Sequence, residues 1–376
     1  MYIGVPTEIK NHEYRVGLTP DSVRELTGHG HQLLVQSGAG SAIGFSDEDY
    51  REAGARLVSR EQVFSDSELV VKVKEPQAEE RRLLRPGQTL FTYLHLAPDP
   101  AQTRDLLASG ATCIAYETVT DAQGRLPLLA PMSEVAGRMA IQAGAGCLEK
   151  ARGGRGVLLG GVPGVPGGRV VILGGGVVGS NALAMAVGLG AQVMVLDKNL
   201  DVLRRLDAHY GNRIETRYAT ATAVEAALLQ ADLVIGAVLV PGAAAPKLIS
   251  ADLIRRMPAG SVLVDVAIDQ GGCAQTSKPT THAEPTYVVD EVVHYCVANM
   301  PGGVARTATQ ALNNATLPFV QALADKGVAR ALREDAHLAN GLNVSHGALC
   351  NAEVGAALDL PVQSLEEALA TLGSTS

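Results

Sequence analysis

The chain is poor in aromatic residues and contains no tryptophan. Aromatic residues make up 3% of its 376 residues, whereas hydrophobic residues of all kinds make up 47%. A chain of this length is long enough for two domains, and their cores must be built from aliphatic side chains. No apolar run of about 20 residues is free of Gly, Pro and charge, as a membrane-spanning helix requires.

Cysteine pairs and excess positive charge are also missing. The five cysteines are odd in number and form no CxxC pair, so we expect reduced thiols and no bound metal. Cys273 has no His near it in the sequence and is expected to be an inert thiol. The net charge of −8 argues against a nucleic-acid or anionic-membrane partner. The first residues, MYIGVPTEIK, do not have the form of a signal peptide, so we expect a cytoplasmic protein.

What the chain does have is a glycine cluster directly after a short apolar run. Val170–Leu173 is expected to be a buried strand, and the following Ala/Leu-rich segment is expected to be a helix. Gly174, Gly176 and Gly179 between them match the dinucleotide fingerprint: a tight turn, a close approach of backbone to pyrophosphate, and close helix packing. The first N–H groups of the helix would hold the phosphates.

An acidic residue follows at the expected distance. The predicted strand Gln192–Leu196 leads into Asp197, roughly 20 residues after Gly174, where the fingerprint places the acid that receives the ribose hydroxyls. A glycine-rich turn alone occurs in many α/β proteins, but strand, helix, second strand and acid in this order indicate a dinucleotide site. The Asp197 carboxylate would repel a 2′-phosphate, which favours NAD over NADP.

Strand and helix patterns alternate on both sides of the glycine cluster. Strands are predicted at Tyr2–Val5, Gln32–Val35, Leu69–Val73, Thr89–Leu94, Thr112–Tyr116, Leu233–Ala237, Val262–Val266 and about Tyr295–Val297. Helices are predicted at Pro20–Thr27 with Thr19 as N-cap, at Asp47–Ala53 behind Ser46, and along the Ala-rich segment Ser133–Lys150. A helical tail follows, with an apolar stripe at Ala308, Leu312, Ala315, Phe319 and Leu323.

This alternation predicts an α/β protein with two doubly wound parallel-sheet domains, one of them a Rossmann dinucleotide-binding domain, and a cleft between them. The Rossmann domain should end near residue 305, so the tail is expected to return to the first domain. The predicted boundaries are 1–130 plus 306–376 for a discontinuous substrate domain and 131–305 for the NAD-binding domain.

Four ionisable residues follow predicted strands and could line that cleft: Arg15, Lys74, His95 and Asp269. Each has a plain structural alternative, because a loop arginine is usually solvated and a histidine after an apolar strand is often structural. The stretch AEERRLL, residues 78–84, is expected to be a solvated helix face.

Long stretches of the chain resemble the alanine dehydrogenase family. They are GVPTEIKNHEYRV at Gly4–Val16, KVKEP at Lys72–Pro76, LHLA at Leu94–Ala97, AYETV at Ala115–Val119, PLLAPMSEVAGR at Pro127–Arg138, GGRGVLLGGVPGV at Gly153–Val165, ADLVIGAVLVPG at Ala231–Gly242, DVAIDQGG at Asp265–Gly272 and YCVANMPG at Tyr295–Gly302. The resemblance implies a reversible NAD-dependent oxidative deamination of L-alanine to pyruvate and ammonium, by a homo-oligomer that is expected to be a hexamer.

The resemblance also implies residue roles. Arg15 would bind the substrate carboxylate and Lys74 the carbonyl oxygen, while His95 and Asp269 would transfer protons. Cofactor contacts are implied at Ser133, Gly174, Gly176, Val177, Val178, Gly179, Asp197, Val238, Leu239, Val266, Ile268, Asp269, Lys278, Asn299 and Met300. Two positions depart from the family pattern at the adenosine end. Val202 and Leu203, followed by Arg204, stand where some members have a basic residue, and Lys278 stands where an Arg is found.

Three alternatives stay open. The fold could act on a bulkier 2-amino acid, because pocket volume depends on packing. It could be a non-catalytic nucleotide-binding regulator, although such a protein needs no proton-transfer groups. It could resemble the NAD-binding first domain of transhydrogenase, whose members lack a His at position 95 and an Asp at position 269.

Overall fold

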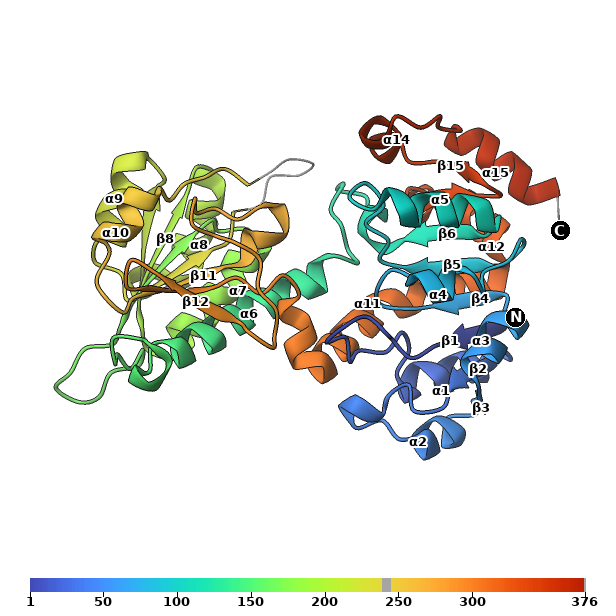
Figure 1. Ribbon diagram of the computed structural model, residues 1–376, viewed down its shortest axis with the longest axis horizontal. Helices are drawn as coiled ribbons and strands as arrows, with labels where there is room; N and C mark the ends of the chain where they lie inside the picture. The colour runs from blue at the N-terminus through green and yellow to red at the C-terminus, as the bar shows by residue number, and fades with distance from the viewer. Residues whose placement is uncertain (239–244, 375–376) are drawn as a thin grey trace. The chain divides into compact units, whose positions relative to one another are not determined.

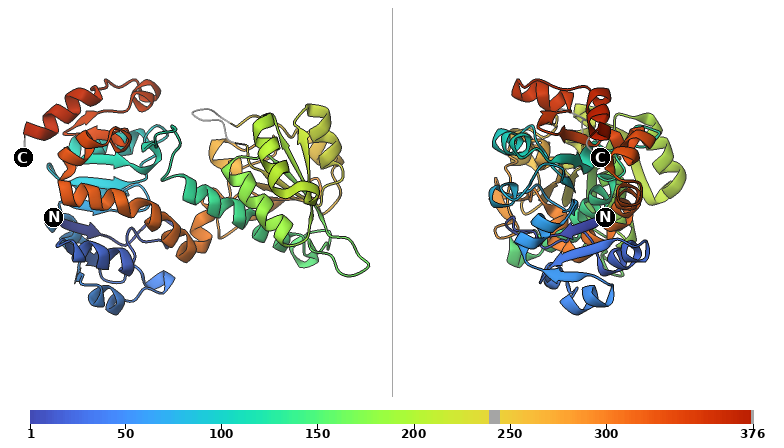
Figure 2. Two further views of the ribbon diagram at one scale, coloured as in Figure 1. Left: turned by 180° about the vertical axis from the view of Figure 1, so that it is seen from behind. Right: turned by 90° about the vertical axis from the view of Figure 1, so that its right-hand side faces the viewer.

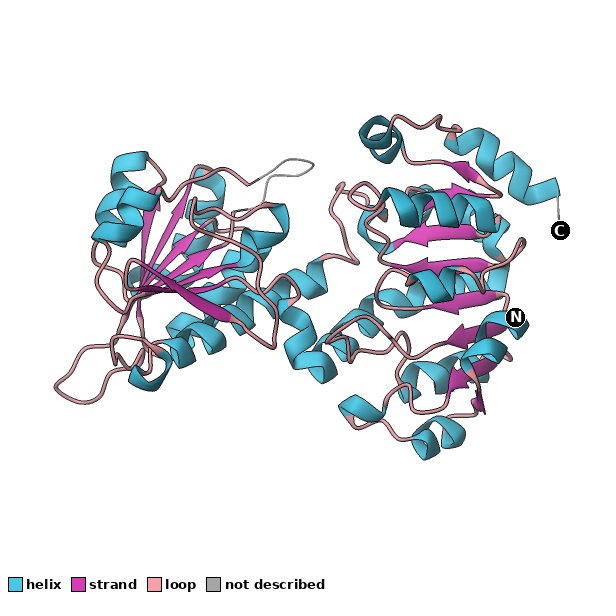
Figure 3. Cartoon of the chain, in the orientation of Figure 1, coloured by secondary structure: helices cyan, strands magenta, loops and turns pink. Residues whose placement is uncertain are grey.

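The computed structural model describes residues 1–238 and 245–374 and contains two compact units. Unit 1 comprises Met1–Met132 and Ala305–Ser376, and unit 2 comprises Ser133–Val304. Each unit has a mostly parallel sheet with helices on both faces (Figure 3), which confirms the predicted α/β fold class.

Unit 1 is built on an eight-stranded sheet with the order β15-β14-β6-β5-β4-β1-β2-β3. The strands are β1 (Tyr2–Val5), β2 (Gln32–Gln36), β3 (Arg56–Val58), β4 (Leu69–Val71), β5 (Thr89–Thr92), β6 (Thr112–Ala115), β14 (Leu342–Ser345) and β15 (Ala348–Leu349). Strands β1 to β6 run parallel. All five predicted strands of this unit are present, and two of them end two residues earlier than predicted, at Val71 and Thr92.

Helices cover both faces of this sheet. They are α1 (Pro20–Gly28), α2 (Asp47–Glu52), α3 (Arg60–Asp66), α4 (Ala78–Arg81), α5 (Pro100–Ser109), α11 (Ala305–Lys326), α12 (Val328–Glu334), α13 (Ala336–Ala339), α14 (Ala352–Leu358) and α15 (Leu365–Ser374). The predicted N-caps are confirmed, because the side chain of Thr19 accepts a hydrogen bond from Ser22 N and that of Ser46 from Asp49 N. Helices α4 and α5 lie on one face and α11 lies on the other (Figures 1 and 2).

The strand order of unit 1 reverses between β1 and β4. The chain proceeds from β1 to β2 and β3 in one direction, and then from β4 to β5 and β6 in the other. Such a reversal opens a crevice at the carboxyl ends of the two central strands. The loop after β1 runs directly over the end of β4, since a Cβ on Gly17 would lie 2.3 Å from the Val71 carbonyl oxygen. Side chains carried by this loop therefore lie at the crevice.

The expectation of an all-helical tail is wrong for residues 342–349. Strand β14 pairs antiparallel with β6, and β15 pairs antiparallel with β14. His346 and Gly347 form the tight turn between these strands, and both have positive φ. The helical periodicity of the tail does not indicate this hairpin. In α11, Ala308, Leu312 and Leu323 are buried as predicted, but Val320 is fully buried where Phe319 was expected.

Unit 2 has a seven-stranded sheet with the order β12-β13-β11-β10-β7-β8-β9. The strands are β7 (Arg169–Leu173), β8 (Gln192–Asp197), β9 (Ile214–Tyr218), β10 (Leu233–Gly236), β11 (Val262–Asp265), β12 (Thr286–Val289) and β13 (Val292–Tyr295). The helices are α6 (Ala130–Cys147), in which the unit boundary falls, α7 (Val177–Gly188), α8 (Leu200–Tyr210), α9 (Ala221–Leu228) and α10 (Ala251–Arg256). Here the order reverses between β7 and β10.

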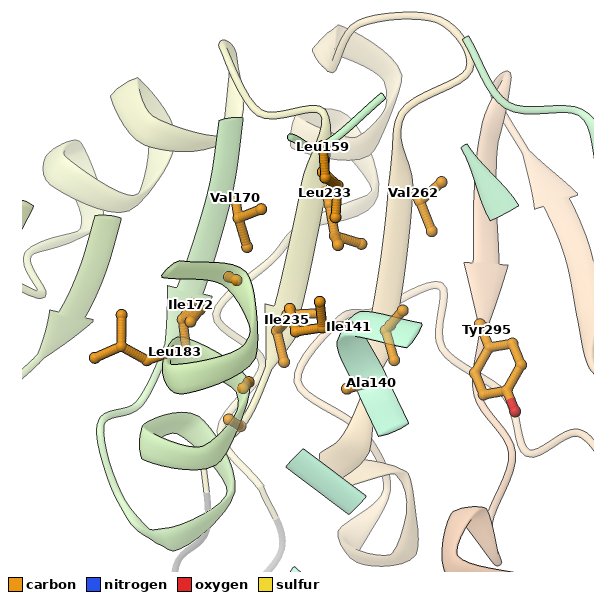
Figure 4. Close-up of a cluster of buried hydrophobic side chains, with 14 of the residues drawn as sticks. Ala140, Ile141, Leu159, Val170, Ile172, Leu183, Leu233, Ile235, Val262 and Tyr295 are labelled. Atoms are coloured by element: carbon orange, nitrogen blue, oxygen red, sulfur yellow. The ribbon is translucent and has the colours of Figure 1, made fainter. Parts of the chain in front are cut away.

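The core of unit 2 is aliphatic, as the lack of aromatic residues requires. Side chains of three adjacent strands, among them Ile172, Ile235 and Val262, pack with Ile141 of α6 and Leu183 of α7 (Figure 4). Helix α6 lies close to the sheet, since a Cβ on Gly144 would be 2.6 Å from a methyl group of Leu233. The sheet that carries the glycine cluster is therefore held firmly on this face.

The predicted strand at Tyr295–Val297 begins three residues and ends two residues too late. The observed β13 ends at Tyr295 and pairs antiparallel with β12, a strand that was not predicted. Asp290 and Glu291 form the turn between them with φ of 46° and 63°. Asp is common at the first of these positions, but the second is normally Gly, so Asp290–Glu291 lacks the Gly that signals a hairpin.

Among the helices in the described part of the chain, none combines the length and the apolar character needed to cross a membrane.

Candidate functional site

Polar side chains gather where four neighbouring strands of unit 1 end. In sheet order, Glu117 follows β6, His95 follows β5, Lys74 follows β4, and the loop after β1 carries Arg15. Because these strands are parallel, their carboxyl ends lie along one edge of the sheet. The structure thus brings three of the four predicted residues, Arg15, Lys74 and His95, to a single edge.

Arg15 is not a solvated loop arginine, and the general expectation for such a residue is wrong here. Its side chain is 2% exposed and pairs with Glu13, Nε to Oε1 at 2.7 Å and Nη2 to Oε2 at 2.6 Å. On the other side, Nη1 lies 3.0 Å from Sδ of Met132. Burial by itself would lower the pKa of the guanidinium, but the hydrogen bond and negative charge of Glu13, together with smaller effects of Tyr93 and Glu8, raise it overall.

Glu13 orients Arg15 and was missed by the sequence analysis. It lies two residues before Arg15, inside the GVPTEIKNHEYRV stretch, and its side chain is completely buried. An acid so close to a candidate substrate-binding arginine is the signal that could have identified it. The pair presents a guanidinium of fixed direction, as carboxylate recognition requires.

Lys74 is partly buried and forms no salt bridge with the described residues. Burial, followed by repulsion from Arg15, lowers the pKa of its ammonium group. Its backbone N–H donates to Oε1 of Glu8 at 3.3 Å. Lys74 is therefore a partly desolvated cation that is repelled by the positive charge of Arg15.

The solvated helix face expected for residues 78–84 is wrong for Glu80, which is fully buried. Its Oε1 accepts a hydrogen bond from Nζ of Lys72 at 2.8 Å, because α4 turns this one side chain toward the sheet while Glu79 stays exposed.

His95 has a strained backbone and an accessible ring. Its φ is 50°, and its backbone N–H donates to Oε1 of Glu117 at 2.6 Å. The imidazole is 45% exposed, stacks on the Tyr93 ring with centroids 5.8 Å apart, and places Nδ1 3.8 Å from Glu117 Oε1. Strained residues of this kind cluster at functional sites. Glu117 was also missed, although it lies within the AYETV stretch.

The glycine loop of unit 2 has the geometry that its fingerprint predicts. Gly174 has φ of 96°, and a Cβ there would be 2.7 Å from the Ala237 carbonyl oxygen. A Cβ on Gly179 would be 1.8 Å from the Gly174 carbonyl oxygen, so only glycine permits this packing. A Cβ on Gly176 would have no neighbour within 4 Å. Gly176 thus faces open space, where a pyrophosphate would approach.

Asp197 ends β8 beside this loop. Its Oδ2 accepts a hydrogen bond from Gly175 N at 2.7 Å and its Oδ1 accepts one from Asn199 N at 2.8 Å. The carboxylate is therefore fixed next to the turn, in the position predicted for the ribose acid. Val202 packs against Gly175, since a Cβ built on Gly175 would lie 2.6 Å from a methyl group of Val202.

Val177 and Val178 are the first residues of α7, and Val177 is 47% exposed. Helix α6 crosses this first turn closely, because a Cβ on Gly137 would be 2.2 Å from the Val178 carbonyl oxygen. Ser133 lies one helical turn before Gly137, on the same face of α6. Val177 and Val178 thus form the amino terminus of α7, the kind of position at which anions bind, and α6 packs against it at Gly137.

Four further predicted cofactor residues follow β10 and β11. Val238 borders the glycine turn, with its Cα 3.2 Å from a Cβ built on Gly174. Val266, Ile268 and Asp269 belong to the 3₁₀ turn η5 (Val266–Gln270), in which Ile268 is buried and Asp269 is exposed. Leu239 lies outside the described residues.

Lys278, Asn299 and Met300 follow later in unit 2. Nζ of Lys278 lies 4.5 Å from the centre of the Tyr287 ring. The Asn299 carbonyl oxygen hydrogen-bonds to Nε2 of His282 at 2.7 Å. Met300 is 2% exposed and packs in the core of the unit.

Two hollows in unit 2 border Arg169 and Gln192, at the amino-terminal ends of β7 and β8. None of the predicted site residues lines them. In the described residues no group of three or more His, Cys, Asp or Glu side chains is arranged to hold a metal ion.

Comparison with known proteins gives consistent results along the chain. The N-terminal domain model of alanine dehydrogenase/PNT matches residues 4–136, and the C-terminal domain model matches residues 140–352. An alanine dehydrogenase of Halomonas elongata is 64% identical over 96% of this chain and 97% of its own length. A solved L-alanine dehydrogenase is 54% identical, with a TM-score of 0.93 over 96% of this chain and 99% of the other.

A solved transhydrogenase from Sinorhizobium meliloti is 24% identical, with a TM-score of 0.81 over 93% of this chain and 100% of the other, and shares the fold. The matches to both domain models and the 64% identity over 96% of the chain show that the chain belongs to the alanine dehydrogenase/PNT family.

Proposed function

We propose that this chain catalyses the reversible NAD-dependent oxidative deamination of L-alanine to pyruvate and ammonium. The observation that carries the proposal is the 64% identity, over nearly the whole chain, to a protein named alanine dehydrogenase. The cationic pair Arg15 and Lys74 at the carboxyl edge of the unit 1 sheet supports it, because the substrates on both sides of the reaction carry a carboxylate.

Arg15 binds the substrate carboxylate in this proposal. Glu13 holds the Nε and Nη2 edge of the guanidinium, and Nη1 lies 3.0 Å from Met132 Sδ. The buried Glu13 keeps the planar group from rotating, and a fixed planar cation recognises a carboxylate with defined geometry.

Lys74 then stabilises the oxygen that develops on the carbinolamine and on pyruvate. A cation at the position where negative charge develops lowers the barrier most when it is desolvated beforehand. Burial of Lys74 meets this condition.

His95 and Asp269 transfer protons. Water that attacks the iminium needs a base, and the departing ammonia needs an acid, each worth about 10²–10⁴ in rate. The imidazole of His95 is accessible, and Asp269 is exposed on its 3₁₀ turn. That all four residues line one cleft stays a prediction.

The residues of unit 2 fit NAD. Gly176 leaves space for the pyrophosphate, the first N–H groups of α7 face that space, and Asp197 is fixed beside the turn for the ribose hydroxyls. When bound, NAD accepts the hydride that leaves the substrate Cα.

The test is to mix the purified protein with pyruvate, ammonium and NADH. Oxidation of NADH that requires both pyruvate and ammonium supports the proposal, and its absence across a range of pH contradicts it. Values of kcat/KM for alanine, serine, valine and their 2-oxo acids decide whether a bulkier amino acid is the better substrate.

We further propose that the protein is a cytoplasmic homohexamer, as the family resemblance implies. Light scattering of the purified protein measures the number of subunits, and a mass other than that of six chains contradicts the hexamer.

A further inference from the structure

Unit 1 contains a buried charge cluster that the proposed chemistry does not use. Nζ of Lys72, which is 0% exposed, lies 3.1 Å from Glu8 Oε2 and 2.8 Å from Glu80 Oε1. Burying such ions costs several kcal/mol each, and apolar residues of similar size are often equally stabilising. Stability alone therefore does not account for the cluster.

The cluster contacts the backbone that carries Lys74. The second oxygen of Glu8, Oε1, accepts hydrogen bonds from Val73 N at 2.7 Å and from Lys74 N at 3.3 Å. Strand β4 has ended at Val71, although Lys72 N still donates to Phe91 O of β5. Beyond this point the Glu8 side chain binds the N–H groups of Val73 and Lys74, while their carbonyl oxygens accept hydrogen bonds from Tyr93 N at 3.3 Å and from Thr92 Oγ1 at 2.9 Å. The side chain and the neighbouring segment together fix the direction in which the backbone leaves the sheet.

The other members of the cluster hold the Glu8 carboxylate in place. Lys72 donates a hydrogen bond to Oε2 of Glu8 and another to Oε1 of Glu80, and Oε2 of Glu80 accepts a hydrogen bond from Gln77 N at 2.7 Å. The three side chains thus connect the loop after β1, the end of β4 and the beginning of α4. Burial alone would lower the pKa of Lys72, but Glu8 and Glu80 raise it, so the lysine is charged at neutral pH.

We propose that Glu8 is a positioning residue for Lys74: it anchors the Val73–Lys74 backbone through Oε1, and the Lys72–Glu80 pair anchors Glu8 in turn. This inference rests on the proposed role of Lys74 in binding the substrate oxygen. It differs from a purely electrostatic role, in which the charge of Glu8 would matter and its hydrogen bonds would not.

Two variants separate these roles. Glu8→Gln removes the charge and, because an amide nitrogen takes the place of Oε2, also the hydrogen bond from Lys72, but it keeps an oxygen that can accept from both backbone N–H groups. Glu8→Asp keeps the charge, but its side chain is one methylene shorter, so it cannot reach the backbone and Lys72 together. If Glu8 positions Lys74, we expect Glu8→Asp to raise the KM for pyruvate at least tenfold and Glu8→Gln to raise it less than threefold. The KM for NADH should change less than twofold in both.

Gln88→Ala is the matched control. Gln88 is also fully buried and donates to Phe64 O and Ser67 O, but it lies at the opposite end of β5. Its loss should lower Tm without a selective rise in the KM for pyruvate. The inference is overturned if Glu8→Asp leaves that KM unchanged, if Glu8→Gln raises it as much as Glu8→Asp does, or if Gln88→Ala has the same selective effect.

A second readout does not depend on turnover. The full-length protein is treated with an amine-modifying reagent, and the rate of modification of each lysine is measured by mass spectrometry. We expect the rate at Lys74 to change at least threefold in Glu8→Asp and the rate at the exposed Lys198 to stay the same. An unchanged rate at Lys74 overturns the inference. If the wild-type protein does not turn over pyruvate, the proposed function fails, whereas the labelling result still tests the positioning of Lys74.

Discussion

The backbone N–H of His95 donates a hydrogen bond of 2.6 Å to Oε1 of Glu117, and this bond holds His95 in the left-handed region with φ of 50°. A non-glycine residue in this region costs about 1–3 kcal/mol and persists only when its surroundings impose it. Glu117 follows β6 and His95 follows the neighbouring strand β5, so residues after two adjacent strands determine the position of the His95 imidazole.

Removal of this bond should misdirect His95. We expect Glu117→Ala to lower kcat at least tenfold, because the turn at His95 relaxes, and Glu117→Gln to keep most of the activity, because an oxygen acceptor remains. The measurement is kcat for pyruvate amination together with Tm. Equal kcat of Glu117→Ala and the wild-type enzyme would show that the hydrogen bond to Glu117 is not required for the backbone conformation of His95.

Substitution of two fingerprint glycines by alanine should affect stability and NADH binding differently. Gly179→Ala places a methyl group 1.8 Å from the Gly174 carbonyl oxygen, and overpacking of this kind costs about 1–3 kcal/mol, so Tm should fall. Gly176→Ala meets nothing within 4 Å, so Tm should stay within error while the Kd for NADH rises, because the methyl group occupies the space for the pyrophosphate. Thermal unfolding and NADH fluorescence measure the two effects. A Gly176→Ala variant that binds NADH normally would place the pyrophosphate elsewhere.

Asp197 should determine the choice between cofactors. Asp197→Ala removes the charge that repels a 2′-phosphate and also the acceptor for Gly175 N, so we expect weaker NAD binding and a relaxed bias against NADP. Asp197→Asn is the control, because it removes the charge and keeps an acceptor oxygen. The measurement is the ratio of kcat/KM for NADH and NADPH. An unchanged ratio in both variants rules out the assignment of Asp197.

Binding of pyruvate should weaken at alkaline pH through Lys74. Because burial lowers the pKa of Lys74, its positive charge is lost as pH rises through a value below 10.5, and the attraction for the substrate oxygen goes with it. We expect the KM for pyruvate, at a fixed concentration of free ammonia, to rise over this range. In Lys74→Arg the rise should disappear, since a guanidinium stays charged. Persistence of the rise in the arginine variant would assign it to another group.

The parts of the fold and site that follow local rules could be predicted from the sequence. The fingerprint glycines could be located because each is required by the close packing within one short segment. The N-caps Thr19 and Ser46 could be located because a capping side chain bonds to the first turn of its own helix. Lys74 and His95 could be placed because residues that follow parallel strands share one edge of the sheet.

What depends on tertiary partners could not be predicted. Glu117 and Glu8 are functional candidates because of the groups that they bind, and their local sequence does not distinguish them from solvated acids. Glu80 was assigned to the surface for the same reason. For Glu13 the local signal is its position two residues before Arg15. The β12–β13 hairpin was missed because Asp290 and Glu291 adopt left-handed backbone without the usual turn residues.

The central claim is that this chain deaminates alanine with His95 and Asp269 as its proton-transfer groups. The most direct measurement is kcat for alanine in the wild-type protein, His95→Ala and Asp269→Ala, with the Kd for NADH measured in parallel by fluorescence. We predict that each variant loses at least about 10² in kcat, as loss of a general acid or base should cause, while the Kd for NADH changes little. Near-normal deamination by both variants, or no alanine-dependent reduction of NAD by the wild-type protein, would contradict the account.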